Sequence, residues 1–150
     1  MVEFLESTTN QNNFSNAVEE AVYYTKKLLT YVDNVIITMG KHGVMVGRKR
    51  GSALDEFLNI PQTPASESPQ QIRHYKSPDV SHIESVSGAG DCFASGFIAA
   101  LLAGKSENIC VSVGFAAAKM ALQTRSPVPD KLFGQDHEAW KTPVDYKTFH

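Results

Sequence analysis

Cysteine is scarce in this chain, and its two cysteines fit neither a disulfide framework nor a metal site. Cys92 and Cys110 lie far apart, each inside an apolar, helix-like pattern, whereas small secreted scaffolds use many cysteines and zinc sites use closely spaced ones. This scarcity favours a reducing, cytoplasmic compartment. Buried, inert thiols are the simplest interpretation, although a thiol near a helix N-terminus, such as Cys92, can have a lowered pKa.

Long apolar runs and a large excess of either charge are also missing. No stretch has the roughly 18 apolar residues that a membrane-spanning helix requires, and the first residues lack the layout of a signal peptide. The net charge is −2, so we expect neither a nucleic-acid partner nor a membrane partner. The one basic cluster, Arg48–Arg50, lies between two glycines and is interpreted as an exposed hairpin tip.

The first half of the chain predicts a helix followed by two strands. An apolar stripe with helical spacing covers residues 15–32, and Asn16 with Glu19 forms a capping pair at its start. The β-branched run Val35–Met39 predicts a strand that is buried on both faces, as in parallel sheets. A tight glycine turn then leads to a second short strand at residues 43–46.

The second half predicts a long loop and a helix pair. Residues 55–82 contain four prolines, and their apolar residues follow no helical or strand period. They predict a long loop with at most one strand, at 57–60 or at 72–75. Helices are expected at 90–102 and 109–124, the first ending at a glycine. We therefore predict one α/β domain over the 150 residues, with a mostly parallel sheet flanked by helices.

The segment Ser87–Asp91, which reads Ser-Gly-Ala-Gly-Asp, is the strongest candidate for chemistry. Glycines let backbone N–H groups approach a ligand, and the helix that starts here points its positive end at the same place. An aspartate there suits a neutral hydroxyl that must lose a proton, which is a phosphoryl-transfer arrangement. Alternatively, Asp91 only complements the helix dipole. The chain has no Walker loop and no G-x-G-x-x-G motif.

Three motifs, in order, resemble the ribokinase-like (PfkB) carbohydrate kinases. Residues 85–98 resemble the C-terminal signature of that family, Thr38–Val44 resembles its T-L-G-x-x-G-V strand and turn, and Ala116–Ala118 with Gln123–Arg125 resembles its A-A-A…V-T-R helix. The resemblance covers about residues 15–130 and leaves a polar tail at 131–150. It implies the C-terminal, nucleotide-binding portion of a ribokinase-like fold.

The resemblance also implies an activity: ATP-dependent transfer of a phosphoryl group to a hydroxyl of a sugar or nucleoside, with Mg²⁺ on the phosphates. Asp91 stands at the catalytic base, and Gly88, Ala89 and Gly90 stand at the anion hole. The implied nucleotide-binding residues are Thr38, Gly40, Lys41, Gly43, Ser87, Ala117 and Ala118. Ser85 replaces an aspartate tied to a monovalent cation, so K⁺ is implied less firmly than Mg²⁺. The proline-containing segment before the motif resembles pseudouridine kinases.

Family members are longer, and their N-terminal half supplies the sugar site. The chain is therefore expected to be a partial ribokinase-like domain that self-associates through apolar surface. Asn16 to Glu19 matches the family's magnesium motif, N-x-x-E, but is interpreted as a helix cap. Two alternatives stay open: a catalytically inactive nucleotide-binding or interaction module, and an α/β scaffold with a coincidental motif. Trp140 and Tyr146 in the tail suit either a packed anchor or an exposed binding element.

Overall fold

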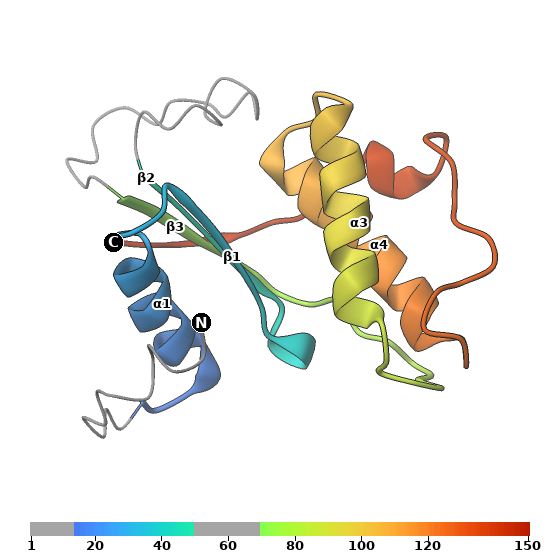
Figure 1. The fold of residues 1–150 in the computed structure, drawn as a ribbon, viewed down its shortest axis with the longest axis horizontal. Coiled ribbons are helices and arrows are strands. Elements are labelled where there is room, and N and C mark those ends of the chain that lie inside the picture. Colours follow the sequence, from blue (N-terminus) through green and yellow to red (C-terminus); the bar gives the residue numbers. More distant parts are fainter. Residues whose placement is uncertain (1–13, 50–69) are drawn as a thin grey trace.

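The structure of the chain is a computed structural model that describes residues 14–49 and 70–150 (Figure 1). Its elements, in chain order, are helix α1 (Ala17–Leu28), strands β1 (Asn34–Thr38), β2 (Val44–Lys49) and β3 (Gln70–Tyr75), helices α3 (Ala89–Leu102) and α4 (Glu107–Leu122), and strand β4 (Lys147–Phe149). Short 3-10 turns lie at η1 (Gly40–His42) and η2 (Glu138–Trp140). The alternative strand at 57–60 lies outside the described residues, whereas the one at 72–75 is confirmed as β3.

The sheet of the described residues is antiparallel, in the order β1-β2-β3-β4, so the expected mostly parallel sheet is wrong. Thr38 pairs with Val44 across η1, and so short a connection can join only antiparallel neighbours, because a parallel pair needs a crossover of about a dozen residues. The apolar run that suggested a parallel strand is also unevenly buried. Val35 is 8% exposed, whereas Ile36 is 43% exposed.

The two faces of the sheet carry different layers. One face packs on α1 through a cluster of apolar side chains: Ala21, Leu29, Val35, Met45 and Ile72. The other face packs on the α3–α4 pair through a larger cluster that includes Val44, Val46, Tyr75, Phe93, Phe97, Val111 and Phe115. Because successive side chains of a strand point to opposite faces, neighbours such as Met45 and Val46 belong to different clusters. In Figure 1, α1 and the helix pair lie on different sides of the strands.

The predicted helix boundaries hold to within a few residues. Asn16 caps α1 by accepting hydrogen bonds from the N–H groups of Val18 and Glu19, both at 3.0 Å, which confirms the cap interpretation. Gly104, just after α3, has a φ of +72°, as expected at the end of a helix. Ser106 precedes α4, but its hydroxyl donates to Asn108 Oδ1 at 2.6 Å and does not cap the backbone.

The tail returns to the body of the molecule. Trp140 is 8% exposed within the cluster on the helix-pair side, and β4 pairs with β3 at residues such as Phe149. Tyr146 is 49% exposed, and its ring lies 5.4 Å from that of Tyr75. Trp140 is therefore the packed anchor, and Tyr146 is a half-exposed ring that contacts Tyr75 of β3.

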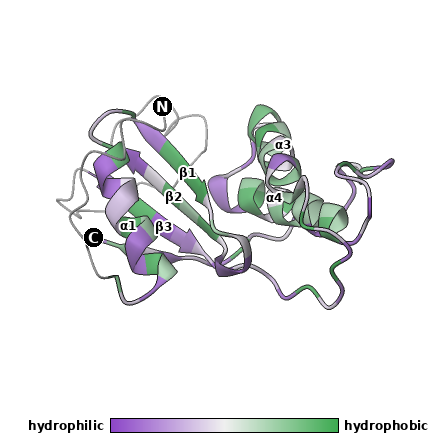
Figure 2. Cartoon of the chain, turned by 60° about the horizontal axis from the view of Figure 1, so that its bottom comes forward, coloured by the Kyte–Doolittle hydropathy of each residue, from purple (hydrophilic) through white to green (hydrophobic). Residues whose placement is uncertain are grey.

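The helix pair leaves apolar side chains at the surface. Figure 2 shows α3 and α4 mainly in hydrophobic and neutral colours, whereas α1 carries many hydrophilic residues. Ile98 is 52% exposed and Leu102 is 74% exposed, a kind of surface that often marks contacts between molecules. The expected self-association stays a prediction. Among the described residues, none of the helices has the length and apolarity needed to cross a bilayer.

Candidate nucleotide site

A cavity of about 660 Å³ lies between the sheet, the start of α3 and the second half of α4. Its lining comes from η1 and the adjoining strand ends, from residues 76–86, and from α3 and α4. The described residues around it are Thr38, Gly40, Lys41, Gly43, Val44, Lys76, Ser77, Pro78, Asp79, Val80, Ile83, Val86, Ala89, Gly90, Phe93, Phe115, Ala118 and Leu122. The volume falls in the range of small-molecule and cofactor sites.

The η1 turn forms one wall of this cavity and depends on Gly43. Gly43 has a φ of +92°, and a Cβ placed on it would collide with the backbone oxygen of Tyr75 on the neighbouring strand. The N–H of Met39 donates to the Gly43 carbonyl at 2.8 Å, which closes the turn. Backbone geometry and packing therefore both require glycine at this position.

The N-terminus of α3 forms the opposite wall. Gly88 adopts a left-handed conformation with a φ of +78°, and a Cβ on it would collide with the backbone oxygen of Pro127. The first N–H groups of a helix have no intrahelical partner, and no side chain caps them at the start of α3. Gly90 differs from Gly88, because a Cβ on Gly90 would meet no atom within 4 Å. The N-terminal end of α3 thus offers free donors beside open space.

Asp91 lies on the same first turn but lines a second, smaller cavity of about 170 Å³. Its carboxylate is exposed. Ala117 of α4, only 3% exposed, also belongs to this second cavity and not to the larger one. Asp91 and Ala117 are therefore placed on a different side of α3 from the main cavity.

The larger cavity brings together seven of the residues singled out from the sequence. They are Thr38, Gly40, Lys41, Gly43, Ala89, Gly90 and Ala118. Ser87 and Gly88 precede α3 and do not line the larger cavity. The N–H of Ser87 donates to Ser85 Oγ at 3.2 Å. The binding and catalytic roles of all these residues stay predictions.

Sequence reasoning missed the segment 76–86 as a wall of the cavity. Lys76, Ser77 and Asp79 follow β3 closely and line the cavity, and Ile83 lines it further along the chain. The segment is held in place from α4, since the N–H of Glu84 donates to the Leu122 carbonyl at 2.8 Å. Its irregular composition carried no periodic signal, and only the position after a strand could have indicated it.

A salt-bridged carboxylate anchors the same segment at the surface. Glu84 accepts a hydrogen bond from His82 Nε2 at 2.6 Å and one from Arg125 Nε at 3.4 Å. The hydrogen bond from His82, followed by that from Arg125, lowers the pKa of Glu84 below its ordinary value.

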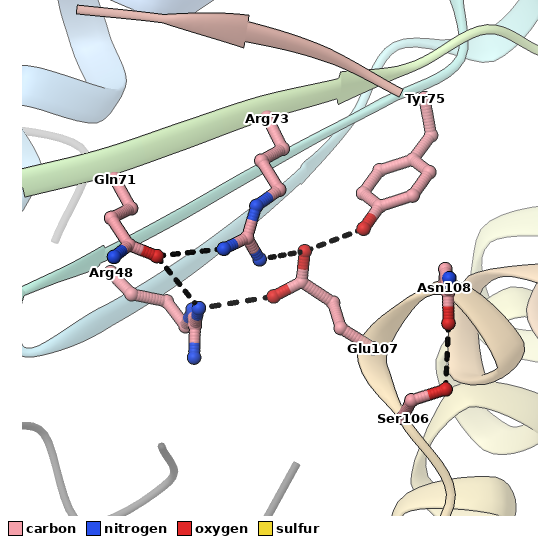
Figure 3. Close-up of polar contacts among 7 residues, drawn as sticks. All are labelled: Arg48, Gln71, Arg73, Tyr75, Ser106, Glu107 and Asn108. Atoms are coloured by element: carbon pink, nitrogen blue, oxygen red, sulfur yellow. Dashed lines mark hydrogen bonds and ion pairs between the residues drawn. The ribbon is translucent and has the colours of Figure 1, made fainter. Parts of the chain in front are cut away.

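A buried ionic cluster lies between the sheet and α4 (Figure 3). Arg73 Nη1 lies 2.9 Å and Arg48 Nε 3.3 Å from the two oxygens of Glu107, and the Tyr75 hydroxyl donates to the same carboxylate at 2.6 Å. Gln71 Oε1 accepts hydrogen bonds from both guanidinium groups. The interpretation of Arg48–Arg50 as an exposed tip is thus wrong for Arg48, which is 2% exposed.

The cluster shifts the titration of its members. Burial raises the pKa of Tyr75, and the negative charge of Glu107 raises it further. For Arg73, burial alone would lower the pKa, but the charge of Glu107 and its hydrogen bond outweigh burial, so that the pKa of Arg73 is raised. Arg73 therefore stays charged and Tyr75 neutral around one carboxylate.

Both thiols are buried. Burial raises the pKa of Cys92, and the nearby charge of Asp91 raises it further, so the option of a lowered pKa at this helix N-terminus is wrong. Burial, followed by the charge of Glu107, raises the pKa of Cys110 to about 12. Neither thiol is poised as a nucleophile.

Solved structures of sugar kinases share this α/β fold. A probable sugar kinase from Rhizobium etli CFN 42 matches 75% of this chain with a TM-score of 0.55 and 22% identity, and the match covers 27% of that protein. A putative sugar kinase from Clostridium perfringens matches 91% of this chain with a TM-score of 0.57 and 12% identity, covering 37% of that protein. No curated protein matches the chain significantly.

The likeness to these structures shows that the chain has the fold of part of a sugar kinase. More specifically, the chain belongs to the pfkB family of carbohydrate kinases, because the model of that family matches residues 3–131. The chain nevertheless spans only 27% and 37% of the lengths of the two sugar kinases.

Proposed function

We propose that the chain binds ATP in the larger cavity and supplies the catalytic base for phosphoryl transfer to a hydroxyl of a sugar or nucleoside. One observation carries the proposal: the uncapped N-terminus of α3 and the η1 glycine turn open onto the same cavity. Free N–H groups and the positive end of the helix dipole favour bound phosphate. Membership of the pfkB family supports the same chemistry.

The cavity offers suitable surfaces for both ends of a nucleotide. Phe93, Phe115 and Ala118 line it on the helix side, and flat apolar walls of this kind suit a nucleobase. Lys41 and Lys76 line it on the sheet side, and both are exposed at its edge. Their ammonium groups would balance the charge of the phosphates.

Asp91 is proposed as the base because it follows the cavity-lining Gly90 on the first turn of α3 and is exposed to solvent. Its carboxylate lines the neighbouring second cavity, so the acceptor hydroxyl must lie at the border of the two cavities, within hydrogen-bond distance of Asp91. The hydroxyl oxygen of the acceptor forms a bond to the γ-phosphorus while the bond from that phosphorus to the bridging oxygen of ADP breaks. The hydroxyl proton passes to the Asp91 carboxylate.

Mg²⁺ would bind together with the nucleotide, through its phosphate oxygens. Among residues 14–49 and 70–150, no group of three or more acidic, histidine or cysteine side chains is placed to hold a metal ion. Magnesium in kinases commonly uses one or two carboxylates together with phosphate oxygens and water, and Asp79 is a carboxylate that lines the cavity. When bound, the ion would neutralise charge on the transferring group.

A second candidate function is nucleotide binding without catalysis. The chain spans 37% or less of the sugar kinases it resembles, and the residues that hold an acceptor in such enzymes need not all be present.

Asp91→Asn tests the proposed role of the base. We expect the 150-residue chain to phosphorylate members of a sugar and nucleoside panel that includes pseudouridine, and Asp91→Asn to lower turnover by about 10²–10⁴-fold with little change in ADP affinity by calorimetry. Asp130→Asn, at an exposed aspartate that lines neither cavity, serves as the control. ADP binding without turnover by the unsubstituted chain would favour the non-catalytic function, and equal loss of binding and turnover in Asp91→Asn would refute the role of Asp91.

A further inference from the structure

The buried ionic cluster of Arg48, Arg73, Tyr75 and Glu107 joins the same two layers that enclose the larger cavity. On the sheet side, Arg48 lies on β2, which begins at the cavity-lining Val44, whereas Arg73 and Tyr75 lie on β3, directly before the cavity-lining Lys76 and Ser77. On the helix side, Glu107 opens α4, which lines the cavity at Phe115, Ala118 and Leu122. The cluster and the cavity thus share one interface.

The cluster constrains this interface differently from the apolar contacts around it. Apolar packing is non-directional, so it tolerates small shifts of a helix across a sheet. Hydrogen bonds of 2.6 Å from Tyr75 and 2.9 Å from Arg73 to one carboxylate oxygen fix the position of Glu107 relative to β3. The ion pair from Arg48 on β2 to the other oxygen adds a constraint from the next strand.

Glu107 places its carboxylate between the two guanidinium groups, and its side chain is 2% exposed. Without its charge, both guanidinium groups would lose this shared counter-charge beside the positive end of α4. The first turn of α4 would then move away from the strands. Because α4 continues into the cavity wall, the cavity would widen.

We infer that Glu107 is a positioning residue that sets the separation between α4 and the sheet, and through it the size of nucleobase that the cavity accepts. The inference rests on the proposed function, since it takes the cavity to be the nucleotide site. It assigns to Glu107 no contact with the nucleotide itself.

Glu107→Gln tests the inference through the choice of ligand. Calorimetry measures the affinities of the unsubstituted chain and the variant for ADP, for N6-benzyl-ADP, whose base is larger, and for inorganic tripolyphosphate. We expect the ratio of N6-benzyl-ADP affinity to ADP affinity to rise about fivefold in Glu107→Gln, within the usual range of coupling between distant sites. Tripolyphosphate affinity should stay within about twofold, because the start of α3 is not disturbed.

Tyr75→Phe provides a milder change should Glu107→Gln fail to fold. It removes one hydrogen bond to the carboxylate while keeping the ring, and the affinity ratio should rise in the same direction by about twofold. Asp33→Asn is the matched control, because it breaks the exposed ion pair of Asp33 with Lys49, which follows Arg48 on β2 but points to the opposite face of the strand. The affinity ratio should not change in this control.

Two results would overturn the inference alone. One is an unchanged affinity ratio in a folded Glu107→Gln or Tyr75→Phe variant, and the other is a parallel loss of all three ligands, which would show a merely structural role. If the unsubstituted chain binds neither nucleotide, the proposed function fails and the inference fails with it.

Discussion

The two faces of the sheet differ in what packs against them. The face toward α1 is closed by apolar side chains such as Leu29 and Met45, both fully buried. The face toward the helix pair combines an apolar cluster with the buried Glu107 ion pairs and a cavity of about 660 Å³. Buried charge and empty space both cost stability. The first face therefore serves as scaffold, and the second combines support with the cavity proposed as the nucleotide site.

The largest effect is expected from Leu29→Ala on the scaffold face. Leu29 is 0% exposed, so its truncation should lower the free energy of unfolding by about 2–5 kcal/mol. ADP affinity of the folded protein should not change. Urea unfolding and calorimetry measure the two quantities, and Leu28→Ala, at a residue 37% exposed, is the matched control. A comparable loss in the control, or weakened ADP binding in folded Leu29→Ala, would contradict the division between the faces.

Local patterns predicted most of the scaffold face. The helix at 15–32, its Asn16 cap and the first two strands follow from residues that are neighbours in the sequence, and the structure places them as α1, β1 and β2. The parallel arrangement was wrong because the apolar content of Val35–Met39 was given more weight than the tight turn after it, which permits only antiparallel pairing.

The other face depends on contacts between residues far apart in the sequence. Arg48 looked like a surface residue because its counter-charge, Glu107, lies on a different element and 59 positions later. The glycines of the two turns were recognised from their motifs, and both Gly43 and Gly90 line the larger cavity. Asp91 and Ala117 line another cavity. This could not be predicted, because the sequence does not say which side of α3 and of α4 faces the sheet.

The second effect in size should come from Gly43→Ala at the edge of the cavity. The positive φ and the collision of a Cβ with the Tyr75 carbonyl should cost about 1–3 kcal/mol of stability and weaken ADP binding, because the turn must shift. Thermal unfolding and calorimetry provide the measurements. Gly40→Ala is the control for the collision: Gly40 also has a positive φ, of +56°, but a Cβ there meets no atom within 4 Å, so this substitution should cost less. Equal costs for the two substitutions would refute the packing role given to Gly43.

Gly90→Ala should separate stability from binding. A Cβ at this position meets nothing within 4 Å, and alanine is favoured over glycine inside a helix by about 0.5–1 kcal/mol. We therefore expect a protein as stable as the unsubstituted chain or slightly more stable, with weaker ADP binding because the methyl group obstructs the phosphates. Chemical unfolding with calorimetry checks both, and undiminished ADP affinity would argue against phosphate binding at this helix N-terminus.

A further effect concerns alkaline pH. The pKa of Cys110 is raised to about 12 from an ordinary value of 9.0, so the folded state keeps the thiol protonated where the unfolded state ionises. The resulting stabilisation is complete below pH 9 and is lost as the pH rises from 9 toward 12. Urea unfolding at pH 8 and pH 10 should show this loss, and Cys110→Ala should reduce it. An identical pH dependence in Cys110→Ala would contradict the assignment.

The central claim, that the nucleotide binds on the helix-pair face and not on the scaffold face, is tested most directly by titrating the ¹⁵N-labelled chain with ADP. The claim predicts chemical-shift changes at the amides of Gly40, Gly43 and Gly90, which come from both walls of the cavity. The amides of Ala21 and Leu29, on the α1 side, should not shift. No shift at the three glycines, or shifts concentrated on the α1 side, would contradict it.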